Sequence, residues 1–259
     1  MIAQFALRLI CGMSLMWALM PRRQVTSGFF RIQMLVVMGL GVLITLTVRQ
    51  HDWFEDTLTP AFPPIIALLG FLGSVLWTLE RRSGGEWIGF ALCAVSVGAL
   101  LLSNITFEDM SRPVVWLTPL SQLAGSGVLG GTVVGMLLGH WYLTAPTMSI
   151  DPLKRINLFL GVAGVLRFVV SAAVVLLLWG GAFDPGETSS RLAAVPKAWF
   201  GLRWLAGVIG PIVVSVMVWR ILKYRNTQAA TGVLFVGVIL AFIGDMTAAL
   251  LLSETKLPL

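Results

Sequence analysis

Long apolar segments alternate with short polar ones along the whole chain. Eight of the apolar runs are each about as long as a helix that crosses the hydrocarbon core of a bilayer, which takes ~20 residues. The strict apolar–polar alternation of membrane β-barrel strands is absent. The pattern therefore predicts an all-α, polytopic integral membrane helical bundle with about eight transmembrane helices. The predicted spans are residues 2–20, 32–48, 60–79, 86–103, 114–143, 158–179, 198–222 and 229–252.

Basic residues are unevenly divided between the segments that connect these spans. The segments after the first, third, fifth and seventh spans hold ten, namely Arg22, Arg23, Arg31, Arg81, Arg82, Lys154, Arg155, Arg220, Lys223 and Arg225. The opposite side holds five, namely Arg49, Arg112, Arg191, Lys197 and Lys256. Because Lys and Arg are enriched in cytoplasmic loops, we expect both termini to lie outside. The protein is expected to be a multi-pass protein of a bacterial inner (cytoplasmic) membrane.

The composition agrees with this class, since 57% of residues are hydrophobic and 12% are charged, against about 25% charged in an average soluble chain. The net charge of +6 does not indicate a nucleic-acid partner, because the basic residues occupy short loops rather than one continuous patch. No connecting segment is long enough for a soluble domain, so residues 1–259 are expected to form a single transmembrane domain. Residues 2–20 lack the flanks of a cleaved signal peptide and are interpreted as a retained first span.

A regular run of glycines marks the fifth predicted span. Gly127, Gly131, Gly135 and Gly139 recur every four residues and share one helix face. In water each glycine would weaken a helix by roughly 1 kcal/mol relative to alanine. In a bilayer such a face, a glycine zipper, lets another helix approach backbone to backbone. We therefore expect these four residues to form a packing centre, either within the chain or against another subunit.

Four charged residues lie well inside predicted spans, away from their ends, where an ionised side chain is costly and needs a reason. Arg8, Arg203 and Asp245 are expected at similar depths in the outer half of the bilayer, so an Arg203–Asp245 pair between neighbouring helices is plausible. Such a pair either sets helix register as a structural salt bridge or forms a pocket for a ligand head group or a proton. Arg167 is expected near mid-membrane, where it faces a cavity, a lipid, another subunit or Asp245, or bonds to free carbonyls near a kink.

His140 and Tyr142 end the glycine face near the inner interface. They are either residues of an interfacial belt or hydrogen-bond donors and proton relays for a quinone or a docked subunit, since histidine titrates near neutral pH. A haem held by two histidines is not expected, because His51 and His140 are predicted on opposite sides of the membrane. No covalently bound cofactor is expected either. No cluster of His, Cys, Asp and Glu has the spacing of metal ligands, so no metal site is expected.

The last predicted span contains Gly and Asp within an apolar run, V-I-L-A-F-I-G-D-M-T-A-A-L-L-L at Val238 to Leu252. Together with the eight-span topology, this segment resembles the terminal helix of quinone-interacting membrane anchor subunits of the polysulfide reductase and dimethyl-sulfoxide reductase class. The resemblance implies a haem-free subunit that passes electrons between a quinone and a partner subunit carrying iron–sulfur or haem centres. It also implies that Arg8, Arg203 and Asp245 form the quinone pocket, with membrane lipids and other protein subunits as partners.

Two other functions remain open from the residues alone. A small-solute or proton-coupled transporter or channel would use the same buried charges, with Pro211 as a hinge; the lack of a clear internal repeat argues against it. A purely structural membrane subunit would use the glycine face and Arg167 to contact other chains of a multi-subunit complex.

Overall fold

The computed structural model describes residues 2–50, 61–103, 113–145, 147–180 and 195–255, and every regular element in these ranges is helical. Seven helical segments are long and apolar enough to cross a membrane, and α3 is a shorter apolar helix of 17 residues. The predicted all-α, multi-pass membrane character is thereby confirmed. The helices are α1 (Ile2–Leu19), α2 (Ser27–Gln50), α3 (Phe62–Thr78), α4 (Arg82–Leu102), α5 (Pro113–Trp141), α6 (Asp151–Trp179), α8 (Lys197–Trp204), α9 (Gly210–Lys223) and α10 (Thr227–Thr255), with a π-helical segment at Leu205–Ile209 between α8 and α9.

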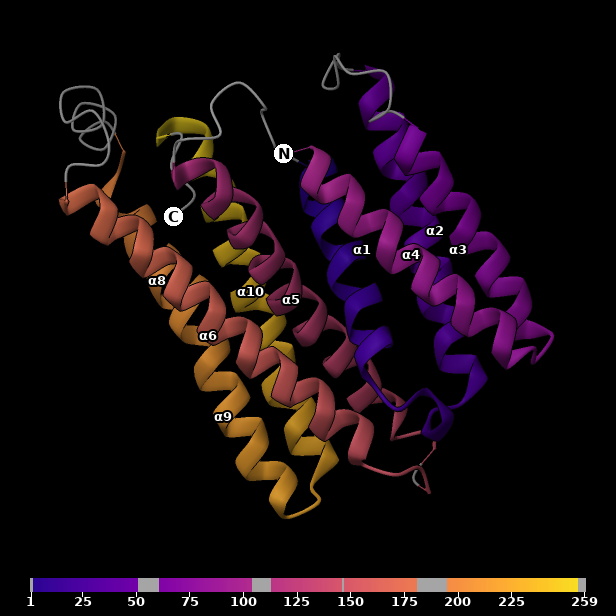
Figure 1. Ribbon diagram of the computed structural model, residues 1–259. Helices are drawn as coiled ribbons and strands as arrows, with labels where there is room; N and C mark the ends of the chain where they lie inside the picture. The colour runs from indigo at the N-terminus through magenta and orange to yellow at the C-terminus, as the bar shows by residue number, and fades with distance from the viewer. Residues whose placement is uncertain (1, 51–60, 104–112, 146, 181–194, 256–259) are drawn as a thin grey trace.

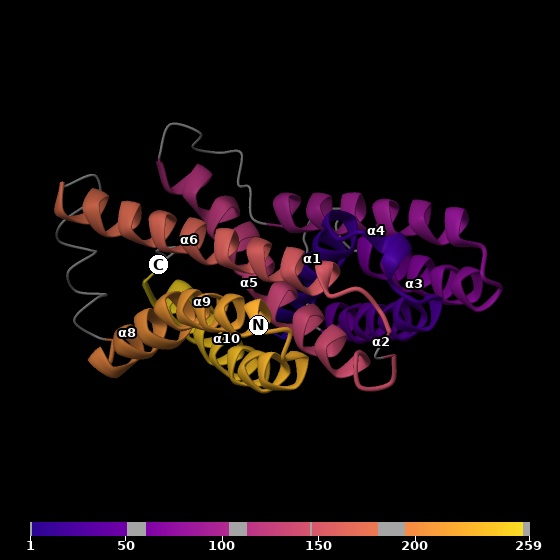
Figure 2. The same ribbon diagram turned by 90° about the horizontal axis from the view of Figure 1, so that it is seen from below.

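The contacts between helices form two rings of four that meet at one seam, and the two groups lie on the right and on the left in Figure 1. In the first ring α1 contacts α2, α2 contacts α3, α3 contacts α4, and α4 returns to α1. In the second ring α5 contacts α6, α6 contacts α9, α9 contacts α10, and α10 returns to α5. The seam is the contact between α1 and α5, and the view from below shows the two groups of helices side by side (Figure 2). Within the first ring each helix packs against the next one in the chain, as is common for consecutive helices.

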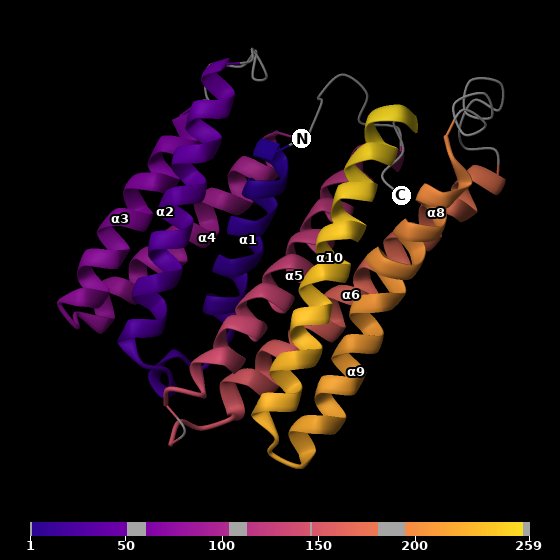
Figure 3. The same cartoon turned by 180° about the vertical axis from the view of Figure 1, so that it is seen from behind.

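The two ends of the bundle differ in what they carry. Helix α1 begins and helix α10 ends at the same end, which we call the terminal end (Figures 1 and 3). The described turns after α1, α3, α5 and α9 lie at the opposite end, which we call the basic end because it carries Arg23, Arg82, Lys154 and Arg225. The apolar side chains between the ends remain widely exposed on the outside of the bundle, as expected of a surface that faces lipid.

Helix α6 is the element whose start differs most from the prediction. It begins at Asp151 rather than at residue 158, because the polar residues before 158 continue the helix beyond the apolar run. Asp151 lies in the first turn, where its negative charge interacts favourably with the positive end of the helix dipole. Pro152 also suits the first turn, where the backbone N–H that proline lacks has no partner in the helix. The extension lies at the basic end, so Arg167 remains near the middle of the helix, twelve residues from its end at Trp179.

Pro211 lies at the start of α9, directly after the π-helical segment. Proline has no backbone N–H and cannot continue the preceding hydrogen-bond ladder, and the wider π turn accommodates this loss. In the same segment, a Cβ atom on Gly207 would lie 2.9 Å from the Cα of Gly244 in α10. The interrupted span therefore lies against α10, backbone to backbone.

At the seam the backbones of α1 and α5 come into direct contact. A Cβ atom on Gly12 would overlap the backbone of Ser126, and one on Gly130 would overlap the backbone of Gly12. This pair was not anticipated from the sequence, because neither glycine belongs to the regular four-residue series.

That series lies on other sides of α5. A Cβ at Gly127 would lie 2.8 Å from Ala163 Cβ and one at Gly131 would lie 3.0 Å from Leu160 Cβ, so both face α6. Gly135 is close to both α6 and α10, and Gly139 lies against Thr231 of α10. The glycine series is thus covered by helices of the same chain.

Candidate functional site

Four charged side chains meet inside the bundle near the terminal end. Arg8 comes from α1, Arg167 from α6, Arg203 from α8 and Asp245 from α10, and their exposures are 4%, 2%, 1% and 0%. Each lies about six to twelve residues from the terminal end of its helix, a depth of about 9–18 Å at the rise of an α-helix. We call this group the Arg–Asp cluster. The structure brings together the three residues predicted to form a pocket, and it adds Arg167.

Asp245 is the acceptor at the centre of the cluster. Its Oδ1 atom accepts a hydrogen bond from Arg8 Nη1 at 3.0 Å and forms an ion pair with Arg167 Nη2 at 3.5 Å. Its Oδ2 atom is buried and has no hydrogen-bond partner among the described residues. Arg8 is held on its other side by a 3.4 Å bond from Nε to the carbonyl of Gln4.

The pairing differs from the expected Arg203–Asp245 pair. The Arg203 Nη2 atom donates to Ser171 Oγ of α6 at 3.1 Å, while Arg8 and Arg167 pair with Asp245. The alternative partner foreseen for Arg167 is the observed one. Helix α10 continues to Thr255, three residues beyond the predicted span, so Asp245 lies ten residues from the terminal end of its helix, close to the twelve of Arg167.

Two glycines make room for the cluster. A Cβ atom on Gly125 of α5 would lie 3.3 Å from Arg167 Nη1 and 3.5 Å from Asp245 Oδ1. A Cβ atom on Gly207 of the π-helical segment would lie 2.8 Å from Arg203 Nη1. Sequence reasoning missed both glycines and Ser171. The available signal was that Gly207 lies one helical turn after Arg203 on the same face.

The cluster is strongly electropositive. Among the described residues it contains three guanidinium groups and one carboxylate, all excluded from water. Removing one partner of a buried ion pair typically costs about 3–5 kcal/mol, because the remaining charge is left uncompensated. Arg167 also has two donors, Nε and Nη1, without an acceptor in the part of the chain that the structure describes. Chemically, the cluster offers free donors beside a free carboxylate acceptor.

His140 and Tyr142 lie at the basic end, on the far side of the bundle from the cluster. His140 is exposed. Tyr142 is buried at 4% exposure, and its hydroxyl donates to the carbonyl of Ser149 at 2.5 Å. Burial raises the pKa of Tyr142 above that of an ordinary tyrosine, the bond to the Leu153 backbone opposes this, and the nearby Asp151 carboxylate adds to it. Neither residue reaches the Arg–Asp cluster, and His51 lies outside the described residues.

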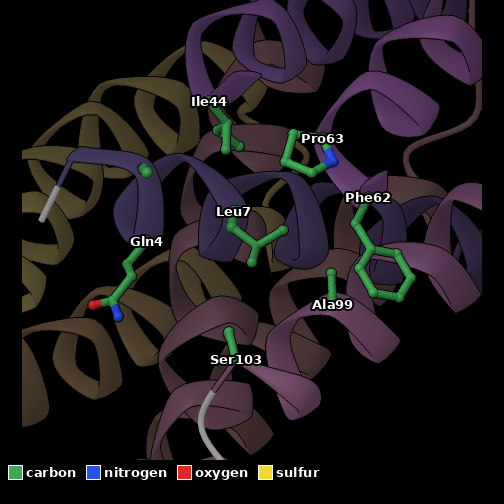
Figure 4. Close-up of a pocket in the computed structure, with 8 residues that line it drawn as sticks. Gln4, Leu7, Ile44, Phe62, Pro63, Ala99 and Ser103 are labelled. Atoms are coloured by element: carbon green, nitrogen blue, oxygen red, sulfur yellow. The ribbon is translucent and has the colours of Figure 1, made fainter. Parts of the chain in front are cut away.

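A small cavity lies in the first ring, beside the start of α1 (Figure 4). Leu7, Ile44 and Phe62 give it apolar walls, and Gln4 and Ser103 are its polar neighbours. Its volume of about 20 Å³ is about the room that one water molecule needs. Gln4 connects it to the Arg–Asp cluster, since the Gln4 carbonyl accepts the bond from Arg8.

Within the described residues there is no group of three or more His, Cys, Asp and Glu side chains that is arranged to hold a metal ion. Comparison of the chain with protein-family models, curated proteins and solved structures finds no match.

Proposed function

We propose that this protein is the haem-free, quinone-linked membrane subunit of a multi-subunit electron-transfer complex, and that the Arg–Asp cluster is its quinone site. The observation that carries the proposal is the Oδ2 atom of Asp245, a buried carboxylate oxygen without a donor, beside Arg167 donors without an acceptor. A quinone carbonyl matches the free donors, and a quinol hydroxyl matches the free acceptor. One redox couple would therefore satisfy both sides of the cluster.

The residues have distinct roles in this proposal. Arg167 donates to the quinone oxygen, and Arg8 holds the Oδ1 atom of Asp245 at 3.0 Å so that Oδ2 points to the ligand. Asp245 takes the proton that leaves a quinol hydroxyl, or returns it on reduction. A quinol supplies two electrons and two protons when it is oxidised; Asp245 would take the protons one after the other and release each toward the terminal end, and a partner subunit with iron–sulfur or haem centres takes up both electrons.

The membrane arrangement in this proposal has eight crossings, with α3 as the shortest. An even number of crossings agrees with α1 beginning and α10 ending at the same end. Because the predicted distribution is ten basic residues against five, the basic end is assigned to the cytoplasm of a bacterial inner membrane and the terminal end to the outside. The Arg–Asp cluster would then exchange protons with the outer face.

Two measurements test the proposal. The first is mass spectrometry of what co-purifies with the tagged chain in mild detergent; stoichiometric redox subunits or quinone are expected, and a clean homo-oligomer without either contradicts the assignment. The second is binding of a short-chain naphthoquinone, followed by quenching of tryptophan fluorescence. We expect Asp245→Asn to abolish binding and Asp151→Asn, on the exposed surface of the basic end, to leave it unchanged.

The outcome for Asp245→Asn also separates a functional from a structural cluster. A variant that folds but loses quinone binding and quinone-dependent activity supports the proposal. A folded variant that binds naphthoquinone like the unaltered protein refutes it. A variant that does not fold assigns Asp245 to helix register, and the quinone assignment then depends on Arg167→Gln, which leaves the Arg8–Asp245 pair in place.

A second candidate function is proton-coupled transport of a small solute, and the π-helical segment favours it. This segment lies between Arg203 and Pro211 and contacts Gly244 of α10 backbone to backbone, so a hinge there would move two residues of the cluster relative to each other. Solute-driven acidification inside proteoliposomes that contain only this chain would favour transport over the quinone role.

A further inference from the structure

A long groove runs along the outside of the second ring between α6 and α9. The two helices lie side by side at one edge of the bundle (Figures 1 and 2). The groove has a volume of about 420 Å³ and apolar walls that include Val162, Val165 and Val216. Gly161 brings the helices together at its floor, since a Cβ there would lie 2.8 Å from Ser215 Oγ. The groove therefore opens toward lipid and has the shape to take an apolar chain.

The floor of the groove is polar at one place. Asn157 and Ser215 exchange two hydrogen bonds, from Asn157 Nδ2 to the Ser215 carbonyl at 2.9 Å and from Ser215 Oγ to the Asn157 carbonyl at 3.0 Å. The Oδ1 atom of Asn157 has no partner among the described residues, and the side chain is only 3% exposed. A buried acceptor without a donor costs free energy unless a ligand or water supplies one.

At the basic end the groove continues into a polar pocket. Lys154 lines both, one helical turn from Asn157. The pocket has a volume of about 480 Å³, and Arg225, Asp151, Ser149 and Thr227 also line it. Lys154 thus lies where the apolar groove meets the pocket, and Arg225 supplies a second cation within the pocket. The two cavities match the two parts of a phospholipid. The apolar groove suits an acyl chain, and the polar pocket suits a charged, hydroxyl-bearing head group.

We propose that the α6–α9 groove and this pocket form a specific site for an anionic phospholipid whose head group carries hydroxyl groups, with phosphatidylglycerol as the probe. The phosphate lies between Lys154 and Arg225, and a head-group hydroxyl donates to Asp151 on the far side of the phosphate from the groove. One acyl chain follows Val162 and Val165 along the groove. This site lies at the end opposite to the Arg–Asp cluster and does not depend on the quinone role.

The test is native mass spectrometry of the whole chain released from nanodiscs of phosphatidylglycerol or of phosphatidylcholine, whose head group has no hydroxyl donor. We expect one retained phosphatidylglycerol per chain and no retained phosphatidylcholine. Val162→Trp fills the groove and should weaken retention about tenfold. Lys154→Gln removes one head-group charge and should weaken it about fivefold, as expected of one basic residue near the membrane surface.

Matched controls make the test decisive. Val169 lies on α6 two turns beyond Val162, and the two residues are similarly exposed, at 54% and 56%. Val169 does not line the groove, so Val169→Trp should retain lipid like the unaltered protein. Arg155→Gln makes the same charge change next to Lys154 and should also have no effect. Equal loss in the controls, or equal retention of phosphatidylcholine, would show only a general lipid shell and overturn the proposal.

Discussion

The seam between α1 and α5 gives the sharpest prediction from the structure, the substitution Gly12→Ala. The added Cβ would overlap the carbonyl of Ser126 and would lie 2.7 Å from the backbone nitrogen of Gly130. Neither atom belongs to a flexible side chain, so α1 and α5 must separate. Arg8 lies one turn from Gly12 on α1, and the same displacement would therefore disturb its bond to Asp245.

The magnitude follows from two opposing effects. Overpacking a filled contact costs about 1–3 kcal/mol, and an alanine in place of an unhindered helical glycine gains up to about 1 kcal/mol. Gly98 of α4 is the matched control, because a Cβ there would meet nothing within 4 Å. Because both positions are helical, that gain is common to the two variants, and Gly12→Ala should be about 1–3 kcal/mol less stable than Gly98→Ala.

The assay is reversible unfolding in mixed micelles with a rising fraction of dodecyl sulfate, followed by tryptophan fluorescence. Each variant is compared with the unaltered chain under the same conditions. If Gly12→Ala and Gly98→Ala unfold at the same detergent fraction, the two helix backbones are not in contact at the seam, and the geometric reasoning fails.

The remaining predictions concern the Arg–Asp cluster and the basic end. Asp245→Asn should destabilise the protein more than Arg8→Gln, because it leaves three buried guanidinium groups without a carboxylate. The double variant should lose about 1–3 kcal/mol less unfolding free energy than the sum of the losses in the two single variants. Additive losses in the same unfolding assay would contradict the ion pair. Because burial raises the pKa of Tyr142, the folded state favours the neutral phenol over the phenolate. The resulting contribution to the unfolding free energy is present below the ordinary tyrosine pKa of about 10 and is lost as the pH rises above that value. Tyr142→Phe should lose that pH dependence when unfolding is compared at pH 8 and pH 11, and an unchanged dependence would assign it to another group.

The π-helical segment shows where local sequence reasoning ends. Pro211 predicted an interruption of its span, and the interruption is observed in the residues just before it. In the same segment Gly207 lies against Gly244 of α10, two residues far apart in the chain. The proline marks the interruption in the sequence, whereas this contact appears only in the folded chain.

The sequence alone determined that this is an all-α membrane protein, because the length and hydrophobicity of each apolar run are local properties and they decide whether a helix can cross a bilayer. It also singled out Arg8, Arg167, Arg203 and Asp245 as charges that need partners. Only the tertiary structure decided that Asp245 pairs with Arg8 and Arg167, because pairing depends on where each helix begins, how it is rotated and which backbones touch. These are set by packing between residues that lie up to 237 positions apart, and hydrophobic periodicity carries no information about them.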